Sequence, residues 1–225
     1  EIASSLEEAL SRRGIVAYAP RRLRLSDLRA IDLLELLKGL LFDDDILHWW
    51  KAFRHPDLIA WFARKDLPVA ELLSQADDLQ RRHLPIYSAD LDRVLDKDRS
   101  RSSPRYPDVG AAVKRMRGVM AKMRNRSLNE GIRLAFDQVY GDRSIDTENP
   151  EENLLLRSLG MVFDVLDQME TSPVNILLGH SRSTWEIFLF FLKDRDIDPA
   201  PMPSMIDLEG WLELPWNPAP HLLIT

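Results

Sequence analysis

The sequence predicts a mainly α-helical protein with a bundle-like helical body and a short β segment at the C-terminus. In residues 1–198, apolar side chains recur at three- and four-residue spacing, and caps, prolines and charges mark the ends of the segments they define. Residues 199–225 are instead rich in proline and contain short apolar runs typical of strands and turns. We therefore expect helices throughout the body and strands only near the C-terminus.

The expected helices follow one another closely. The Ser-capped stretch 4–14 predicts a short helix, and the leucine-rich stretch 25–42 predicts a longer one. The three aspartates 43–45 are expected to open the next helix, because acids are stabilised at the positive end of a helix dipole. Pro56 stands where a first helical turn tolerates proline, and residues 67–85 predict a further helix that ends at a proline.

The polar, proline-bounded stretch DKDRSRSSPRYP predicts a loop that divides the helical body. After it, seven apolar residues form one helical stripe that we expect to be core and not a cofactor site. They are Val109, Ala112, Val113, Met116, Val119, Met120 and Met123. The predicted organisation is a helical subdomain at 1–98, a linker or loop at 99–107, a second helical subdomain at 108–198, and the start of a sheet-containing domain at 199–225.

Composition sets further bounds. The chain has 225 residues, of which 45% are hydrophobic, and no apolar run is long enough to span a bilayer. It contains no cysteine, which excludes disulfides and thiolate metal sites. We interpret it as a soluble, cytoplasmic segment of a longer protein and expect no cofactor.

Basic residues are concentrated in one part of the chain. The net charge is −6, yet residues 99–126 contain nine Lys and Arg against a single acid, Asp108. This asymmetry favours an anionic partner for one face, although a solvated helix face paired with neighbouring acids remains an alternative. The candidate phosphate contacts are the loop residues Arg99, Arg101 and Arg105 and the helix residues Lys114, Arg115 and Lys122. We expect the loop to be flexible and the three helix side chains to point to solvent.

The stretch VNILLGHSRSTWEIFLFF (174–191) resembles the strand, elbow and helix that expose the nucleophile of a serine hydrolase. However, a nucleophile elbow needs small residues on both sides of the serine, and Ser183 replaces the second glycine. Ser183 and Glu186 have capping-box spacing ahead of an apolar helix, so we interpret the stretch as a helix start. A hydrolase that uses Ser181 is the least favoured alternative.

Other catalytic patterns are absent from the sequence. It has no phosphate-binding loop of the G-x-x-x-x-G-K-[ST] type, and its five histidines do not have metal-ligand spacing. The aspartates 43–45 could bind a cation, but three acids at a helix start are more often partners of the helix dipole. His48, Trp49 and Trp50 could stack on bases, but such a tryptophan pair is usually core. We therefore predict no catalytic residue and no metal site.

Two blocks resemble a known family. WWKAFRHPDLIAWFARKDLPVAELLSQADDLQRRHLP (49–85) is similar to a helical region of large DNA-repair helicase–nuclease proteins, in which an RHPDL helix precedes an LQ…HLP stretch. SMIDLEGWLELPWNPAPHLLIT (204–225) is similar to the segment that leads into a strand in the same proteins. The family is that of the inactivated superfamily-1 helicase subunits of AddAB type, often fused to a PD-(D/E)XK nuclease. Its Walker lysine, nuclease carboxylates and iron–sulfur cysteines have no counterpart here.

This resemblance implies a helical subdomain followed by the start of a RecA-like domain. Together with the basic stretch, it predicts a non-catalytic scaffold that contacts the DNA backbone and a helicase or nuclease partner domain, without a membrane role. The alternative is a protein–protein interaction module with no nucleic-acid role, in which the acidic C-terminal part docks another domain.

Overall fold

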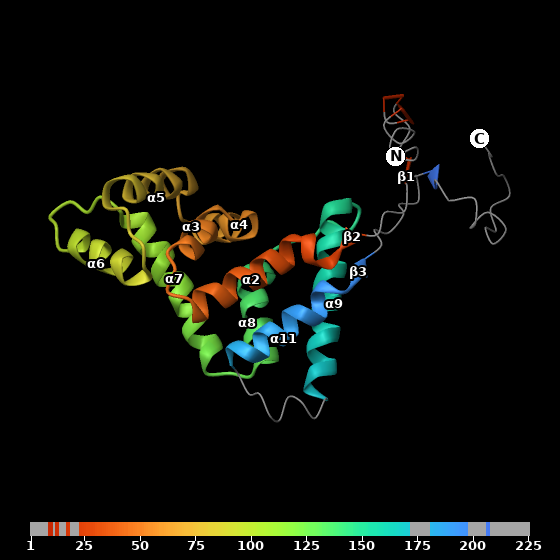
Figure 1. Cartoon of the computed structure of the whole chain (residues 1–225). Helices are drawn as coiled ribbons and strands as arrows, with labels where there is room; N and C mark the ends of the chain where they lie inside the picture. The colour runs from red at the N-terminus through yellow and green to blue at the C-terminus, as the bar shows by residue number, and fades with distance from the viewer. Residues whose placement is uncertain are drawn as a thin grey trace.

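The computed structural model describes residues 23–171 and 181–197, together with residues 9–10, 12–13, 17–18 and 206–207. Within these ranges the protein is mainly α-helical, which confirms the predicted fold class (Figure 1). Its α-helices are α2 (Arg29–Phe42), α3 (Leu47–Arg54), α4 (Pro56–Arg64), α5 (Val69–His83), α6 (Ser88–Arg99), α7 (Pro107–Arg124), α8 (Leu128–Tyr140), α9 (Pro150–Glu170) and α11 (Arg182–Lys193). A 3₁₀ turn, η1 (Leu25–Asp27), precedes α2.

Short strands pair the two ends of the described chain. Strand β1 (Ala17–Tyr18) pairs in parallel with β4 (Ile206–Asp207), and β2 (Leu23–Arg24) pairs antiparallel with β3 (Asp196–Ile197). The expectation that strands are confined to the C-terminus is therefore wrong. A two-residue strand is too short to show alternation in the sequence, and its ladder exists only because a distant segment supplies the other half. Most of the stretches 4–14 and 204–225 lies outside the described residues.

Helix α2 is the central helix of the body. It packs against η1, α3, α7, α9 and α11. Most of its residues are buried, and each fully buried leucine or isoleucine contributes roughly 1.5–3 kcal/mol to folding. Its exposed or half-exposed side chains include Asp32, Glu35 and Lys38, which follow one another at three-residue spacing and mark the face that no other helix covers.

Helix α7 buries all seven residues of the predicted stripe, which are core as expected. It packs most extensively against α8 and also contacts α2 and α5. Pro107 is the first residue of α7, where its missing N–H costs nothing. Ser127 and Glu130 form a reciprocal capping box at the start of α8, which fixes the sharp connection between the two helices.

The region of residues 43–56 corrects one boundary. Helix α3 begins at Leu47, and Asp43 instead forms the C-terminal cap of α2. Asp45 still serves the start of α3, because its carboxylate accepts the Leu47 backbone N–H at 2.8 Å. Pro56 opens α4 as predicted.

The core is continuous across the described body. Buried apolar residues from η1 to α11 belong to one cluster, which includes Trp49 and Trp50. A buried polar contact also joins α4 to α8, because the Tyr140 hydroxyl donates to Asp57 at 3.0 Å. Burial is the main reason why the pKa of Tyr140 is raised.

Helix α6 runs through Arg99, so residues 96–99 of the expected loop are helical. The division of the body into two helical subdomains stays a prediction.

Candidate functional site

The three arginines around the loop between α6 and α7 are paired with aspartates. Their side chains are exposed, yet each lies within ion-pair distance of a carboxylate from α5 or α6. The pairs are Arg99–Asp96 at 3.4 Å, Arg101–Asp98 at 3.7 Å and Arg105–Asp78 at 3.0 Å. These partners come from residues 78–98, directly before the basic stretch.

The loop itself is anchored. Asp98 is buried, and its carboxylate accepts the backbone N–H groups of Arg105 at 2.9 Å and Tyr106 at 2.8 Å. The Tyr106 hydroxyl in turn donates to Asp78 at 3.2 Å, and burial raises the pKa of Tyr106. These hydrogen bonds hold the backbone at the C-terminal half of the loop, which opposes the expected flexibility there, and that flexibility stays a prediction.

The three predicted contacts on α7 differ from one another. Lys114 and Lys122 are exposed, and neither side chain makes an ion pair or hydrogen bond with another described residue. Arg115 is half-buried, and its guanidinium donates to the backbone carbonyl of Lys65. The expectation that all three point to solvent is thus wrong for Arg115, because the turn after α4 lies close enough to capture its side chain.

A groove of about 770 Å³ lies beside α7, and its rim carries charges of both signs. The cations are Arg99, Lys114 and Arg117, and the acids are Asp92, Asp96 and Asp98. Arg117 and Asp92 form an ion pair of 2.5 Å between α7 and α6. The basic run of the sequence is therefore interleaved with acids in space.

Ser181 is the N-cap of α11. Its hydroxyl oxygen accepts the Thr184 backbone N–H at 3.3 Å and lies 3.0 Å from the Thr184 hydroxyl. The interpretation of this stretch as a helix start is confirmed, but the predicted cap is wrong: Ser183 lies inside α11. The histidines at 180 and 221 lie outside the described residues, and within those residues the contacts of the Ser181 hydroxyl are those of a helix cap.

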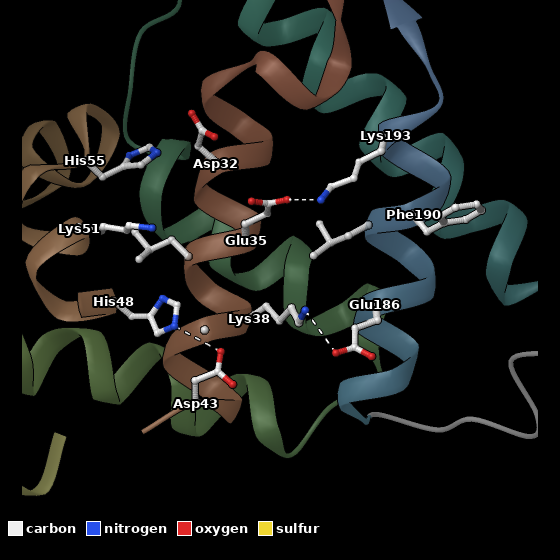
Figure 2. A pocket seen from close by; sticks show the side chains of 13 residues that line it. Asp32, Glu35, Lys38, Asp43, His48, Lys51, His55, Glu186, Phe190 and Lys193 are labelled. Atoms are coloured by element: carbon white, nitrogen blue, oxygen red, sulfur yellow. Dashed lines mark ion pairs between the residues drawn. The ribbon is translucent and has the colours of Figure 1, made fainter. Parts of the chain in front are cut away.

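A second groove, of about 790 Å³, lies over the uncovered face of α2, and we call it the α2 groove (Figure 2). Helix α2 forms its floor, and side chains from α3, from the α3–α4 junction and from α11 form its walls. Gly39 permits the close approach of α3, because a Cβ at this position would lie 2.3 Å from the His48 ring.

Most charged groups of the α2 groove neutralise one another. Three pairs of oppositely charged or titratable side chains line the groove, and Figure 2 marks them with dashed lines. Two of these pairs link α2 to α11. They are Lys193–Glu35 at 2.9 Å, Lys38–Glu186 at 3.5 Å and His48–Asp43 at 3.3 Å. Such partly exposed pairs contribute about 0–1 kcal/mol each, so they orient the walls more than they stabilise the fold.

Three groups at one end of the α2 groove have no such partner. Asp32 and Lys51 are exposed and make no side-chain hydrogen bond or ion pair within the described ranges. His55 is only 9% exposed, and its Nε2 atom is buried without a hydrogen-bond partner there. Figure 2 shows Lys51 and His55 extending toward α2, with Asp32 facing the His55 ring. Burial raises the pKa of Asp32, and the nearby His55 acts in the opposite direction.

The hydrogen bond at the other ring nitrogen sets the tautomer of His55. Its Nδ1 caps α4 by accepting the Asp57 backbone N–H at 3.3 Å, so the neutral ring must carry its proton on Nε2. Burial is the first cause of a lowered pKa for His55, opposed by the charge of Asp57 and by a weak interaction with the Arg29 backbone that does not reach hydrogen-bond geometry. His55 therefore presents a neutral donor, and leaving such a donor buried and unpaired costs roughly 1–3 kcal/mol.

The α2 groove is not predicted by the sequence alone. Its signals were present, since charged residues at three-residue spacing interrupt the apolar helix 29–42 and a histidine precedes Pro56. Neither signal indicates which other helices lie opposite this face of α2.

No cluster of three or more potential metal ligands occurs among the described residues, and no helix within them is long and apolar enough to cross a membrane. No protein-family model, curated protein or solved structure matches the chain.

Proposed function

We propose that this chain is a non-catalytic helical scaffold that contacts a DNA backbone through the exposed cations of α7, within a larger helicase–nuclease-like protein. The observation that carries the proposal is the exposure of Lys114 and Lys122, whose ammonium groups have no acid partner in the described part of the chain. Eight residues separate them on one helix, a distance of about 12 Å along its axis. That distance spans three to four base-pair steps of a duplex, which advance about 3.4 Å each.

The paired arginines fit the same role as secondary contacts. Arg99 and Arg101 form partly exposed ion pairs, which are weak because water and salt screen them. A phosphate can replace such an aspartate, because an Arg–phosphate contact can be bidentate. The resemblance of residues 49–85 to the helical part of AddAB-type proteins supports DNA as the anionic partner.

A salt-dependent titration tests the proposal. Fluorescence anisotropy with labelled duplex and single-stranded DNA, at several salt concentrations, gives the affinity and its salt slope for the wild type and for Lys114→Glu/Lys122→Glu. We expect the double reversal to weaken binding uniformly across sequences and to reduce the duplex slope by about two units, at about 0.9 per lost phosphate contact.

The control is Lys51→Glu/Lys193→Glu, which changes the net charge equally but lies on the α2 groove. Its DNA affinity should stay close to that of the wild type. Equal weakening by both double variants would reduce the effect to net charge alone, and unchanged binding in the α7 variant would reject the site.

The protein–protein interaction alternative also has a specific observation. Four large apolar side chains are exposed at the start of α3 and in the α5–α6 connection: Leu47, Leu84, Ile86 and Tyr87. The backbone hydrogen bond from Ile46 to Ile86, of 3.1 Å, brings these two segments together. Leu84→Ser/Ile86→Ser should reduce self-association in light scattering if this patch joins proteins; an unchanged mass at all concentrations would leave it without support as a self-association surface.

A further inference from the structure

The α2 groove has an unusual balance of free groups. Lys193–Glu35 and Lys38–Glu186 are ion pairs, and Asp43 pairs with Arg182 at 2.8 Å besides its contact with His48. The described lining then retains one free ammonium, Lys51, and one free carboxylate, Asp32. The buried Nε2–H of His55 adds a neutral donor at the same end. These groups come from α2, α3 and the α3–α4 junction, so their approach is a property of the tertiary fold.

This balance selects the charge of a ligand. A simple anion would be attracted by Lys51 but repelled by Asp32, which lies on the floor of the groove. A simple cation would be attracted by Asp32 but repelled by Lys51, since Lys38 and Lys193 are already paired with glutamates. A molecule that carries one charge of each sign satisfies both free groups at once, because each end finds an opposite charge.

The size and lining of the groove fit a small molecule. Its volume of about 790 Å³ is within the range of ligand pockets, which is about 300–1,000 Å³. Leu36, Leu189 and Phe190 contribute apolar surface that can cover a short hydrocarbon spacer. Buried polar groups in folded proteins are almost always paired, and the Nε2–H of His55 makes no hydrogen bond of normal geometry, although the Arg29 backbone lies near its ring, so it can donate to a ligand in the groove.

We propose that the α2 groove binds a small zwitterion of the amino-acid type, whose oxyanion pairs with Lys51 and accepts the Nε2–H of His55, and whose ammonium pairs with Asp32. The side chain of His55 is held in place by its capping bond to Asp57, so the donor is preorganised and needs no change of tautomer. The groove is separate from the cations of α7, and ligand binding here does not depend on DNA binding there.

The test is a titration of the isotope-labelled full chain by two-dimensional amide NMR. The probes are glycine, β-alanine and 4-aminobutyrate, which differ in the separation of their charges, with acetate and methylammonium as single-charge controls at matched ionic strength. We expect saturable shifts at the amides of Asp32, Lys51 and His55 with at least one zwitterion. Each single-charge control should bind at least about tenfold more weakly, because it loses one charge-assisted contact.

Three variants assign the contacts. Lys51→Gln and Asp32→Asn remove one charge each at exposed positions, and each should weaken binding about tenfold. His55→Asn keeps an N-cap for α4 but removes the Nε2 donor, and should also weaken binding. The matched control is Lys97→Gln, an exposed lysine on α6 outside the groove, which should bind like the wild type.

Several results would overturn the proposal. The absence of saturable shifts with all three zwitterions would reject the site. Acetate that binds as tightly as the best zwitterion would redefine it as an anion site, and unchanged binding in Lys51→Gln or Asp32→Asn would remove the charge pairing. Unchanged binding in His55→Asn, with the remaining spectrum intact, would reject the role of the buried donor.

Discussion

The α6–α7 surface and the α2 groove have opposite relations to the sequence. The first is conspicuous in the chain, as nine basic residues against a single acid within residues 99–126. In space, however, aspartates of α5 and α6 pair with Arg99, Arg101, Arg105 and Arg117. The second has no basic run, yet residues 32–55 and 186–193 bring charges of both signs together over α2.

The comparison shows that charge density along a chain is a poor guide to charge density on a surface. Ion pairs form between helices whose acids and bases are far apart in number, as in the pair of Lys193 and Glu35. Clustered like charges repel one another, and ion pairs with the acids of neighbouring helices reduce that repulsion in the folded state. Only the cations that the fold leaves unpaired, such as Lys114 and Lys122, present a positive charge that no neighbouring acid neutralises.

The largest expected effect concerns the anchor of the α6–α7 loop. Asp98→Ala should lower the free energy of unfolding by roughly 2–4 kcal/mol, because the backbone N–H groups of Arg105 and Tyr106 lose a buried acceptor. Urea denaturation followed by circular dichroism measures the change. The control is Asp96→Ala, an exposed carboxylate two residues earlier, for which we expect a change within about 0.5 kcal/mol. Equal effects would show that the loop is not anchored by Asp98.

A smaller effect is expected at the wall of the α2 groove. Ser181→Ala should cost about 1 kcal/mol of stability, because α11 loses its N-cap. The same variant should leave any esterase activity of the chain unchanged, since Ser181 is assigned to capping. Ser183→Ala, inside α11, should cost less and serves as the control. Turnover of an ester that disappears only in Ser181→Ala would instead support the hydrolase alternative.

The smallest expected effect is a pH dependence at His55. Burial lowers its folded-state pKa below the ordinary value of 6.5, so below that pH the unfolded chain binds the proton more readily than the folded protein. The resulting stability is present above pH 6.5 and is lost as the pH falls through the folded pKa. His55→Asn should therefore lose less stability than the wild type between pH 7 and pH 5, as measured by urea denaturation at each pH. Parallel pH profiles would show that the imidazole does not titrate differently on folding.

The sequence by itself determined the helical class, the α7 core stripe and the position of Pro56. These features follow from local rules: side-chain periodicity selects the buried face of a helix, and proline is tolerated only where no backbone N–H is needed. Periodicity also predicted that Met116, Met120 and Met123 are core, and they are buried. The exposure of Lys114 and Lys122 follows from the same stripe.

The tertiary structure decided which charges remain free and where the strands pair. Arg115, like Lys114, lies outside the apolar stripe of α7, yet its side chain reaches the Lys65 carbonyl because α4 ends beside α7. His55 is a helix cap by local rules, but only the packing of α2 against α3 buries its Nε2 beside Asp32. Strand β2 exists because β3, more than a hundred residues later, lies beside it. The physical reason is common to all three: electrostatics, desolvation and ladder pairing depend on distances in space, which the order of residues does not contain.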